Sequence, residues 1–118
     1  MVADKGDIIR LSLEPTLGKE TKGDFRPCLV LSSKAFNKVN SGKTLIAPIT
    51  QGGEFGRIRG FTVPLMGSGT ETQGVVLASE IKILDINARK AKMVEKAPQS
   101  IVDEVLGIVA TIIDCDPR

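Results

Sequence analysis

Only one segment of this chain, residues 101–113, carries a helical hydrophobic period, and this limits the possible folds more than any other feature. Pro98 suits the first helical turn, and Ser100 with Asp103 forms an alternative capping box. The outer face of the segment is acidic, whereas a membrane-bound amphipathic helix needs a basic polar face. We therefore expect one helix that closes the core with aliphatic residues at spacings of three and four, namely Ile101, Val102, Val105, Leu106, Val109, Ile112 and Ile113.

The rest of the chain consists of short apolar or alternating stretches, which are typical of β-strands. In the first stretch Arg10 lies on the polar side of the alternation, which predicts a half-buried strand. A turn of helix is expected within residues 33–40, with Phe36 as its only large apolar anchor. Strands are expected at residues 7–13, 28–31, 44–49, 61–65, 75–78, 81–86 and 91–95. This pattern predicts a mainly β fold, a small antiparallel barrel or curled sheet with a C-terminal α-helix, in a single domain over residues 1–118.

Two long polar loops, at residues 14–25 and 50–60, separate the strands and carry basic side chains. Together these side chains would form a cationic surface that exchanges counterions for phosphates. The net charge of +2 is too weak to establish this, and charge alone favours a scatter of solubilising side chains. The residues concerned are Lys19, Lys22 and Arg26 near the first loop and Arg57 and Arg59 in the second.

Several classes of chemistry are excluded because the sequence has no histidine. A Ser-His-Asp triad and a His-ligated zinc site both require one. No carboxylate cluster has metal-binding spacing, so neither a metal nor a cofactor is expected. No apolar run approaches the roughly 18 residues of a membrane span. Cys28 and Cys115 are far apart in the sequence, and we expect reduced thiols in a cytoplasmic protein.

Several stretches, in this order and at this spacing over residues 6–113, resemble the MazF/PemK toxin family, including its ChpB branch. Each stretch is common by itself, and the ordered combination carries the resemblance. The stretches are Gly6-Asp7-Ile8, Leu13 to Glu20, Gly23 with Arg26-Pro27, Val30-Leu31-Ser32, Phe36-Asn37, Ala47 to Gly53, Phe55, Gly60-Phe61, Gly74 to Leu77 and Ala88-Arg89.

This resemblance implies an SH3-like barrel of the CcdB/MazF kind that forms a homodimer. It also implies an endoribonuclease that cleaves single-stranded RNA, mRNA included, at short specific sequences without a metal. The products would carry a 2′,3′-cyclic phosphate and a 5′-hydroxyl. A cognate antitoxin protein of a type II toxin–antitoxin system would normally block the activity.

Three residues are expected to be catalytic. Arg26 has a permanently charged, forked guanidinium that can hold two phosphate oxygens, and the resemblance assigns it a catalytic role. The hydroxyl of Thr50 can donate to a phosphoryl oxygen, and Glu20 is the candidate base for the ribose 2′-hydroxyl. The alternatives are an arginine at a strand edge, a threonine bonded to its own backbone and a solvated loop carboxylate.

The RNA-binding residues are expected on the same loops. Gln51, Phe55 and Arg57 are expected to recognise bases, with Phe55 stacking on one of them unless it anchors a dimer interface. Lys19 and Lys22 are expected to face phosphates.

The sequence departs from some relatives at three positions. Lys19 stands where some relatives have His, Ser79 where some have Asp, and Leu77 where some have Arg. We still count Ser79 among the RNA-binding residues. The departures affect the expected rate and base specificity more than the reaction class.

Two other interpretations remain open. One is a non-catalytic toxin of the same fold, such as the gyrase poison CcdB, although that branch has a Trp near its end and this chain has none. The other is a barrel whose loops serve only to bind RNA or protein.

Overall fold

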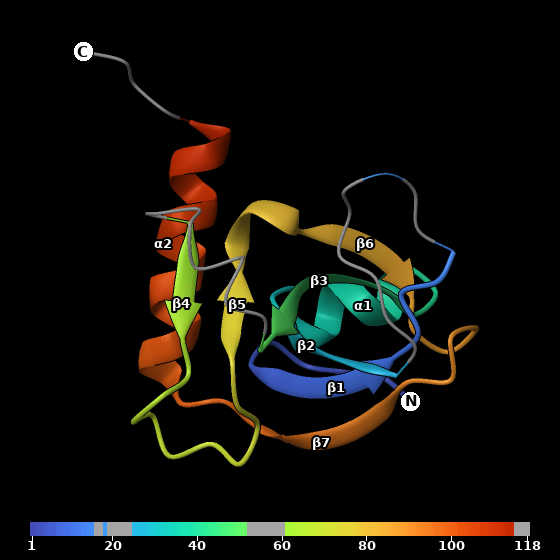
Figure 1. Ribbon diagram of the computed structural model, residues 1–118. Coiled ribbons are helices and arrows are strands. Elements are labelled where there is room, and N and C mark those ends of the chain that lie inside the picture. The colour runs from blue at the N-terminus through green and yellow to red at the C-terminus, as the bar shows by residue number, and fades with distance from the viewer. Residues whose placement is uncertain (16–17, 19–24, 52–60, 115–118) are drawn as a thin grey trace.

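The structure is a computed structural model, and it describes residues 1–15, 18, 25–51 and 61–114. Seven antiparallel strands form one strongly curled sheet, with the helix α2 standing beside β4 and β5 (Figure 1). The strand order is β4-β5-β3-β2-β1-β7, and β6 also pairs with β3. The predicted fold class, a mainly β chain with a C-terminal helix, is confirmed. The elements are β1 (Asp7–Leu11), β2 (Arg26–Val30), α1 (Lys34–Val39), β3 (Lys43–Thr50), β4 (Thr62–Pro64), β5 (Val75–Leu77), η2 (Ala78–Glu80), β6 (Lys82–Asp85), β7 (Lys92–Lys96) and α2 (Gln99–Ile113).

The strand β3 has two successive partners along one edge. Its first half pairs with β6, where Ile46 lies opposite Lys82, and its end pairs with β5, where Thr50 lies opposite Val75. The short 3-10 helix η2 carries the chain from β5 to β6. Because β5 and β6 turn away from each other along β3, the sheet bends there (Figure 1). Its two faces enclose separate cores.

The predicted alternation of β1 holds from residue 9 onward, where Ile9, Leu11 and Leu13 are buried and Arg10 and Ser12 only partly so, but Ile8 on the other face is fully buried as well. Residues that alternate along β1, β2 and β3 point to one core or to the other. One core lies against α2 and contains Ile8, Leu29, Ala47, Ile49, Val63, Val76, Ile101, Val102, Val105 and Val109, among others. The second core lies inside the curl of the sheet and contains Ala3, Ile9, Leu11, Leu13, Cys28, Val30, Ile46 and Ile86.

The helix α2 closes the first core as predicted, but its ends differ from the prediction. Pro98 is the N-cap residue and makes no side-chain capping bond. The expected capping box is therefore wrong, and Asp103 instead accepts a hydrogen bond from Gln99 Nε2 at 2.8 Å. Ile112 and Ile113 in the last turn are 41% and 76% exposed, so the aliphatic stripe continues beyond the core.

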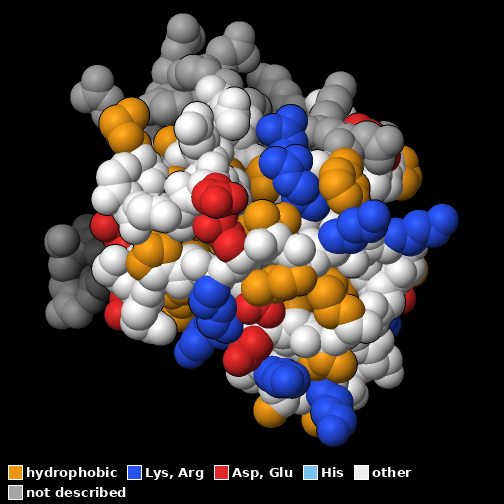
Figure 2. All heavy atoms as spheres, turned by 90° about the horizontal axis from the view of Figure 1, so that it is seen from below, with side chains coloured by type: hydrophobic (Ala, Val, Ile, Leu, Met, Phe, Trp, Pro, Cys, Tyr) orange, Lys and Arg blue, Asp and Glu red, His pale blue; other side chains and the backbone are white. Residues whose placement is uncertain are grey.

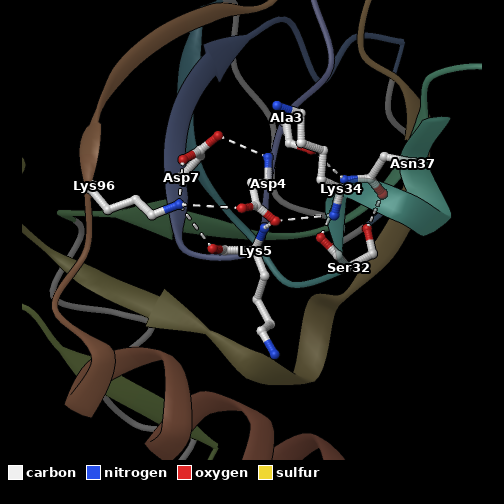
Figure 3. Close-up of polar contacts among 8 residues, drawn as sticks. All are labelled: Ala3, Asp4, Lys5, Asp7, Ser32, Lys34, Asn37 and Lys96. Atoms are coloured by element: carbon white, nitrogen blue, oxygen red, sulfur yellow. Dashed lines mark hydrogen bonds and ion pairs between the residues drawn. The ribbon is translucent and has the colours of Figure 1, made fainter.

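The anchor of α1 is Asn37, not Phe36. Phe36 is 45% exposed, whereas Asn37 is fully buried. The side-chain Nδ2 of Asn37 donates to the carbonyl oxygens of Ala3 at 2.8 Å and Ser32 at 3.2 Å, and Ser32 Oγ donates to Asn37 Oδ1 (Figure 3). The prediction of Phe36 was wrong because it assumed that burial follows hydrophobicity, whereas here a polar side chain satisfies buried backbone groups.

Beside Asn37, the segment before β1 is tied to α1 and to β7 (Figure 3). Asp4 Oδ1 accepts the backbone N–H of Lys34 at 3.0 Å, and Lys96 Nζ contacts Asp7 Oδ1 at 3.0 Å. The backbone hydrogen bonds to Asp4 lower the pKa of its carboxyl below the ordinary value. These contacts fix the start of the chain at the end of the sheet opposite the candidate site.

Candidate functional site

Arg26 and Thr50 meet where two neighbouring strands end. Arg26 is the first residue of β2 and Thr50 is the last of β3, and the antiparallel register of these strands places the two residues opposite each other. Arg26 Nη1 donates a hydrogen bond to Thr50 Oγ1 at 3.2 Å. Arg26 is half-buried and Thr50 is 4% exposed, so both side chains belong to a preorganised pair on rigid elements.

The backbone of Thr50 is held in place by Gly74, which precedes β5. Gly74 has φ +117°, and a Cβ at this position would overlap the carbonyl oxygen of Thr50 and lie 2.8 Å from its carbonyl carbon. A glycine is therefore required twice, for the backbone conformation and for the close approach. The carbonyl of Gly74 also accepts the N–H of Leu65 at 2.9 Å, which closes the β4–β5 connection.

A hollow of about 270 Å³ lies beside Arg26. A larger hollow of about 560 Å³ lies over the β4–β5 connection, and the two hollows are adjacent because Gln51 and Gln73 line both. Among the described residues, two arginines line the smaller hollow, whereas the side chains that line the larger one are uncharged. The smaller hollow is lined by Arg10, Phe25, Arg26, Pro27, Ile49, Gln51 and Gln73.

Phe25 shapes the cationic side of the smaller hollow. It adopts φ +61°, an unusual conformation for a residue with a side chain, and the residue is 44% exposed. Arg10 Nη1 donates to the carbonyl oxygen of Phe25 at 3.3 Å, and Lys92 Nζ lies 5.8 Å from the centre of its ring. Since Phe25 directly precedes Arg26, these contacts also determine how the chain enters β2.

The β4–β5 connection, which forms one wall of the larger hollow, is fixed by Glu95 on β7. The Glu95 carboxylate accepts the hydroxyl of Thr72 at 2.6 Å, the N–H of Thr72 at 2.8 Å and the N–H of Glu71 at 3.1 Å. The hydroxyl of Thr72 is the main reason that the pKa of Glu95 is lowered below its ordinary value, and the two N–H groups add to this. The carboxylate therefore acts as a charged clamp on the loop that carries Gln73.

Cys28 lies two residues from Arg26 but has no nucleophilic role. It is a buried free thiol, and burial raises its pKa to about 12. At neutral pH it stays protonated and serves as a small core residue. In the described part of the chain, no group of three or more His, Cys, Asp or Glu side chains is placed to hold a metal ion.

The structure brings together only part of the predicted site. Arg26, Thr50 and Gln51 lie within one corner of the sheet. Ser79 is exposed on η2 and is not among the residues that line either hollow, while the neighbouring Leu77 is fully buried. The remaining predicted residues lie outside the described ranges, and these are Lys19, Glu20, Lys22, Phe55, Arg57 and Arg59, together with Cys115.

Sequence reasoning missed three residues of this corner. Arg10 was expected on the solvent side of its strand, Phe25 in a polar loop and Gln73 in a turn. No motif marks them, because their proximity depends on the pairing of β1 with β2 and of β5 with β3. The alternation that placed Arg10 opposite the apolar residues of its strand was the one available signal.

Residues 4–113 match the family model described as PemK-like, MazF-like toxin of type II toxin–antitoxin system. The chain is 41% identical over 111 residues to the endoribonuclease toxin ChpB of Escherichia coli K12, covering 94% of each chain. It is similar to a crystal structure of MazF from Deinococcus radiodurans, with TM-score 0.84, 32% identity and coverage of 96% of this chain and 97% of that one. It is also similar to a crystal structure of MazE–MazF from the same organism, with TM-score 0.80, 32% identity and coverage of 98% and 99%. No helix among the described residues has the length and apolar character needed to span a bilayer.

Proposed function

The chain belongs to the PemK-like, MazF-like toxins of type II toxin–antitoxin systems, and from this premise we propose that it is an endoribonuclease that cleaves single-stranded RNA. The observation that carries the proposal is the hydrogen bond between Arg26 and Thr50 at the edge of a hollow. The similar ChpB toxin is named an endoribonuclease. A guanidinium and a hydroxyl fixed side by side suit the recognition of a phosphodiester.

In the proposed reaction the ribose 2′-oxygen attacks the adjacent phosphorus while the bond from phosphorus to the 5′-oxygen breaks. The 2′-hydroxyl gives up its proton to a base, and the departing 5′-oxygen takes one up. The products are a 2′,3′-cyclic phosphate and a 5′-hydroxyl. No metal or cofactor takes part, so the protein must balance the extra negative charge on the phosphorane with its own donors.

Arg26 is the residue proposed to stabilise that charge, because the forked N–H donors of a guanidinium can bind two phosphate oxygens at once. Thr50 orients the guanidinium and adds a hydroxyl donor on the same side. Glu20, on the polar loop before β2, is proposed as the base that accepts the 2′-proton. Gln51 presents an amide at the junction of the two hollows, where it can contact a base next to the cleaved bond.

The proposal has further parts that concern partners. We propose that a cognate antitoxin protein blocks the RNA site, since the structurally similar MazF from D. radiodurans is found with MazE. An RNA analogue at saturation should then weaken antitoxin binding, and independent binding of both would contradict this. We also propose that the toxin acts as a homodimer and encounters mRNA in the cytoplasm.

The test compares Arg26→Ala and Arg26→Lys with the wild type in single-turnover cleavage of RNA in the presence of EDTA. We expect Arg26→Ala to lose at least about a hundredfold in rate, as when a preorganised donor to a developing oxyanion is removed. Arg26→Lys should recover little, because an ammonium cannot reproduce the fork of a guanidinium. Lys38→Ala, on the exposed face of α1, serves as the control with a charge removed elsewhere.

Circular dichroism and an RNA-binding titration accompany the rates. Near wild-type cleavage by Arg26→Ala, or a loss of rate that only reflects lost binding, would disprove the catalytic role. A requirement for Mg²⁺ in the wild type would disprove the metal-free mechanism. RNA binding without any cleavage would support the alternative interpretation, a barrel whose loops only bind RNA.

A further inference from the structure

Two cations face each other across neighbouring strands. Their opposition does not contribute to the stability of the fold and calls for another explanation. Arg10 on β1 lies directly opposite Lys92 on β7. Like charges in directly opposed positions of an antiparallel pair destabilise a sheet. No described carboxylate forms an ion pair with either residue, whereas Lys96, four residues farther along β7, contacts both Asp4 and Asp7. This arrangement leaves local positive charge that an anionic ligand would balance.

One aromatic residue organises both cations. The carbonyl oxygen of Phe25 accepts a hydrogen bond from Arg10 Nη1 at 3.3 Å, and the ring of Phe25 lies 5.8 Å from Lys92 Nζ. The guanidinium of Arg10 has five N–H donors, so most of them remain available to a ligand. We call Arg10, Phe25 and Lys92 the β1–β7 strip. Figure 2, which views the molecule from below, shows several Lys and Arg side chains beside hydrophobic ones, with Asp and Glu side chains among them.

The strip is continuous with the proposed catalytic corner. Arg10 and Phe25 line the same hollow of about 270 Å³ as Arg26. From Arg26 the basic side chains therefore continue over β1 to Lys92 on the exposed strand β7. A ligand that follows them must carry regularly repeated negative charge, as a polynucleotide backbone does.

We propose that Arg10 and Lys92 bind the phosphates next to the one held by Arg26, so that the RNA strand leaves the catalytic corner across β1 toward β7. The inference rests on the proposed endoribonuclease function and adds the path of its substrate. The exposed ring of Phe25 favours RNA over an acidic peptide, because aromatic side chains beside basic ones stack unpaired bases. The strip lies outside the reacting atoms, so it acts in binding and not in the chemical step.

The test begins by mapping one cleavage site in a long RNA. An oligonucleotide around that site, with a 2′-deoxyribose at the cleaved position, then serves as an uncleavable ligand in fluorescence anisotropy. Arg10→Ala, Lys92→Ala and Lys92→Glu are compared with the wild type and with the control Lys38→Ala. Each protein is titrated over a range of salt concentrations.

For single-stranded nucleic acid, the logarithm of the association constant falls with the logarithm of the salt concentration, and each phosphate contact steepens this fall by about 0.7. Arg10→Ala and Lys92→Ala should each make the fall less steep by about that amount. A fourfold rise in salt should then weaken wild-type binding roughly 2.6-fold more than binding by either variant. Lys92→Glu should bind more weakly than Lys92→Ala. At saturating RNA the single-turnover rate of Lys92→Ala should stay within about twofold of the wild type, because Lys92 is not among the residues that line the hollow beside Arg26.

Shortening the RNA on one side of the cleaved bond gives a second readout. On the side that reaches the strip, truncation should abolish the difference between the wild type and Lys92→Ala. Slopes and affinities that match Lys38→Ala would overturn the proposal. So would variants that bind RNA normally but bind an acidic antitoxin peptide more weakly, which would make the strip a protein-docking surface. A wild-type protein that neither binds nor cuts RNA would instead disprove the proposed function itself.

Discussion

Replacing Gly74 with alanine tests whether the site depends on the packing of one backbone segment against another. The added methyl group would overlap the carbonyl oxygen of Thr50. This oxygen belongs to the backbone, so no change of side-chain rotamer can relieve the overlap. The backbone at φ +117° is also disfavoured for any residue with a side chain. Alanine must therefore move β5 or the end of β3.

The expected cost combines strain and displacement. A residue held in a disfavoured backbone region costs about 1–3 kcal/mol, and each hydrogen bond lost between β3, β5 and Leu65 adds about 1 kcal/mol. We expect Gly74→Ala to lower the free energy of unfolding by roughly 2–4 kcal/mol. For a domain of this size, this lowers Tm by roughly 8–16 °C. Since Thr50 moves with the strand end, cleavage should fall even where the variant remains folded.

Gly69→Ala is the matched control, because Gly69 lies in the same connection with φ +95° and has open space where the added methyl group would lie. It should suffer the strain alone, at about 1 kcal/mol, and retain cleavage. Thermal unfolding and single-turnover cleavage at a temperature well below both Tm values separate the two effects. If Gly74→Ala loses no more stability and no more cleavage rate than Gly69→Ala, the close approach of Gly74 to Thr50 contributes neither to stability nor to the site.

Two further predictions concern the loop clamp and the assembly. The folded-state pKa of Glu95 is lowered, so the carboxylate contributes stability above its ordinary pKa of 4.5 and loses it as the pH falls through the folded value. In urea unfolding, Glu95→Gln should therefore lower the free energy of unfolding by about 1 kcal/mol at pH 7 and by progressively less below pH 4.5. A difference between variant and wild type that does not change with pH would contradict the charged clamp. The exposed Ile113 and its neighbour Ile112 leave aliphatic surface on α2, and sedimentation at micromolar concentration should report about twice the chain mass of 12.6 kDa. A fully active monomer would exclude the dimer.

Local patterns in the sequence predicted most elements of the fold. The alternation of the strands and the helical period of the last segment are direct signatures of how each element is buried, and both survive in the structure. The bounds differ by a few residues, because strands end where pairing ends and not where hydrophobicity does. Thus Arg26, which looks like a loop residue before an apolar run, is already paired with Leu11 in the sheet.

The errors came from tertiary contacts that no local pattern reports. Phe36 is exposed because Asn37, with its hydrogen bonds to distant backbone groups, occupies the inward position on α1. Arg10 lies beside the proposed catalytic corner because β1 pairs with both β2 and β7. Arg26 and Thr50 were chosen from the resemblance to a family, and their contact depends on a register that the sequence alone does not specify.

The position of β1 between β2 and β7 also affects when a newly made toxin becomes complete. On the ribosome, β2 is available to β1 early, but β2 ends at residue 30 and β7 begins at residue 92. At a translation rate of about 5–20 residues per second, the edge of β1 that pairs with β7 stays without its partner strand for roughly 3–12 s after β2 has been made. Arg26 has been made when this interval begins and Thr50 follows within its first third, whereas the wall formed by Gly74 and β5 is missing for most of the interval, and α2 follows later still. The order of elements thus leaves the proposed RNA site incomplete until most of the chain has been made.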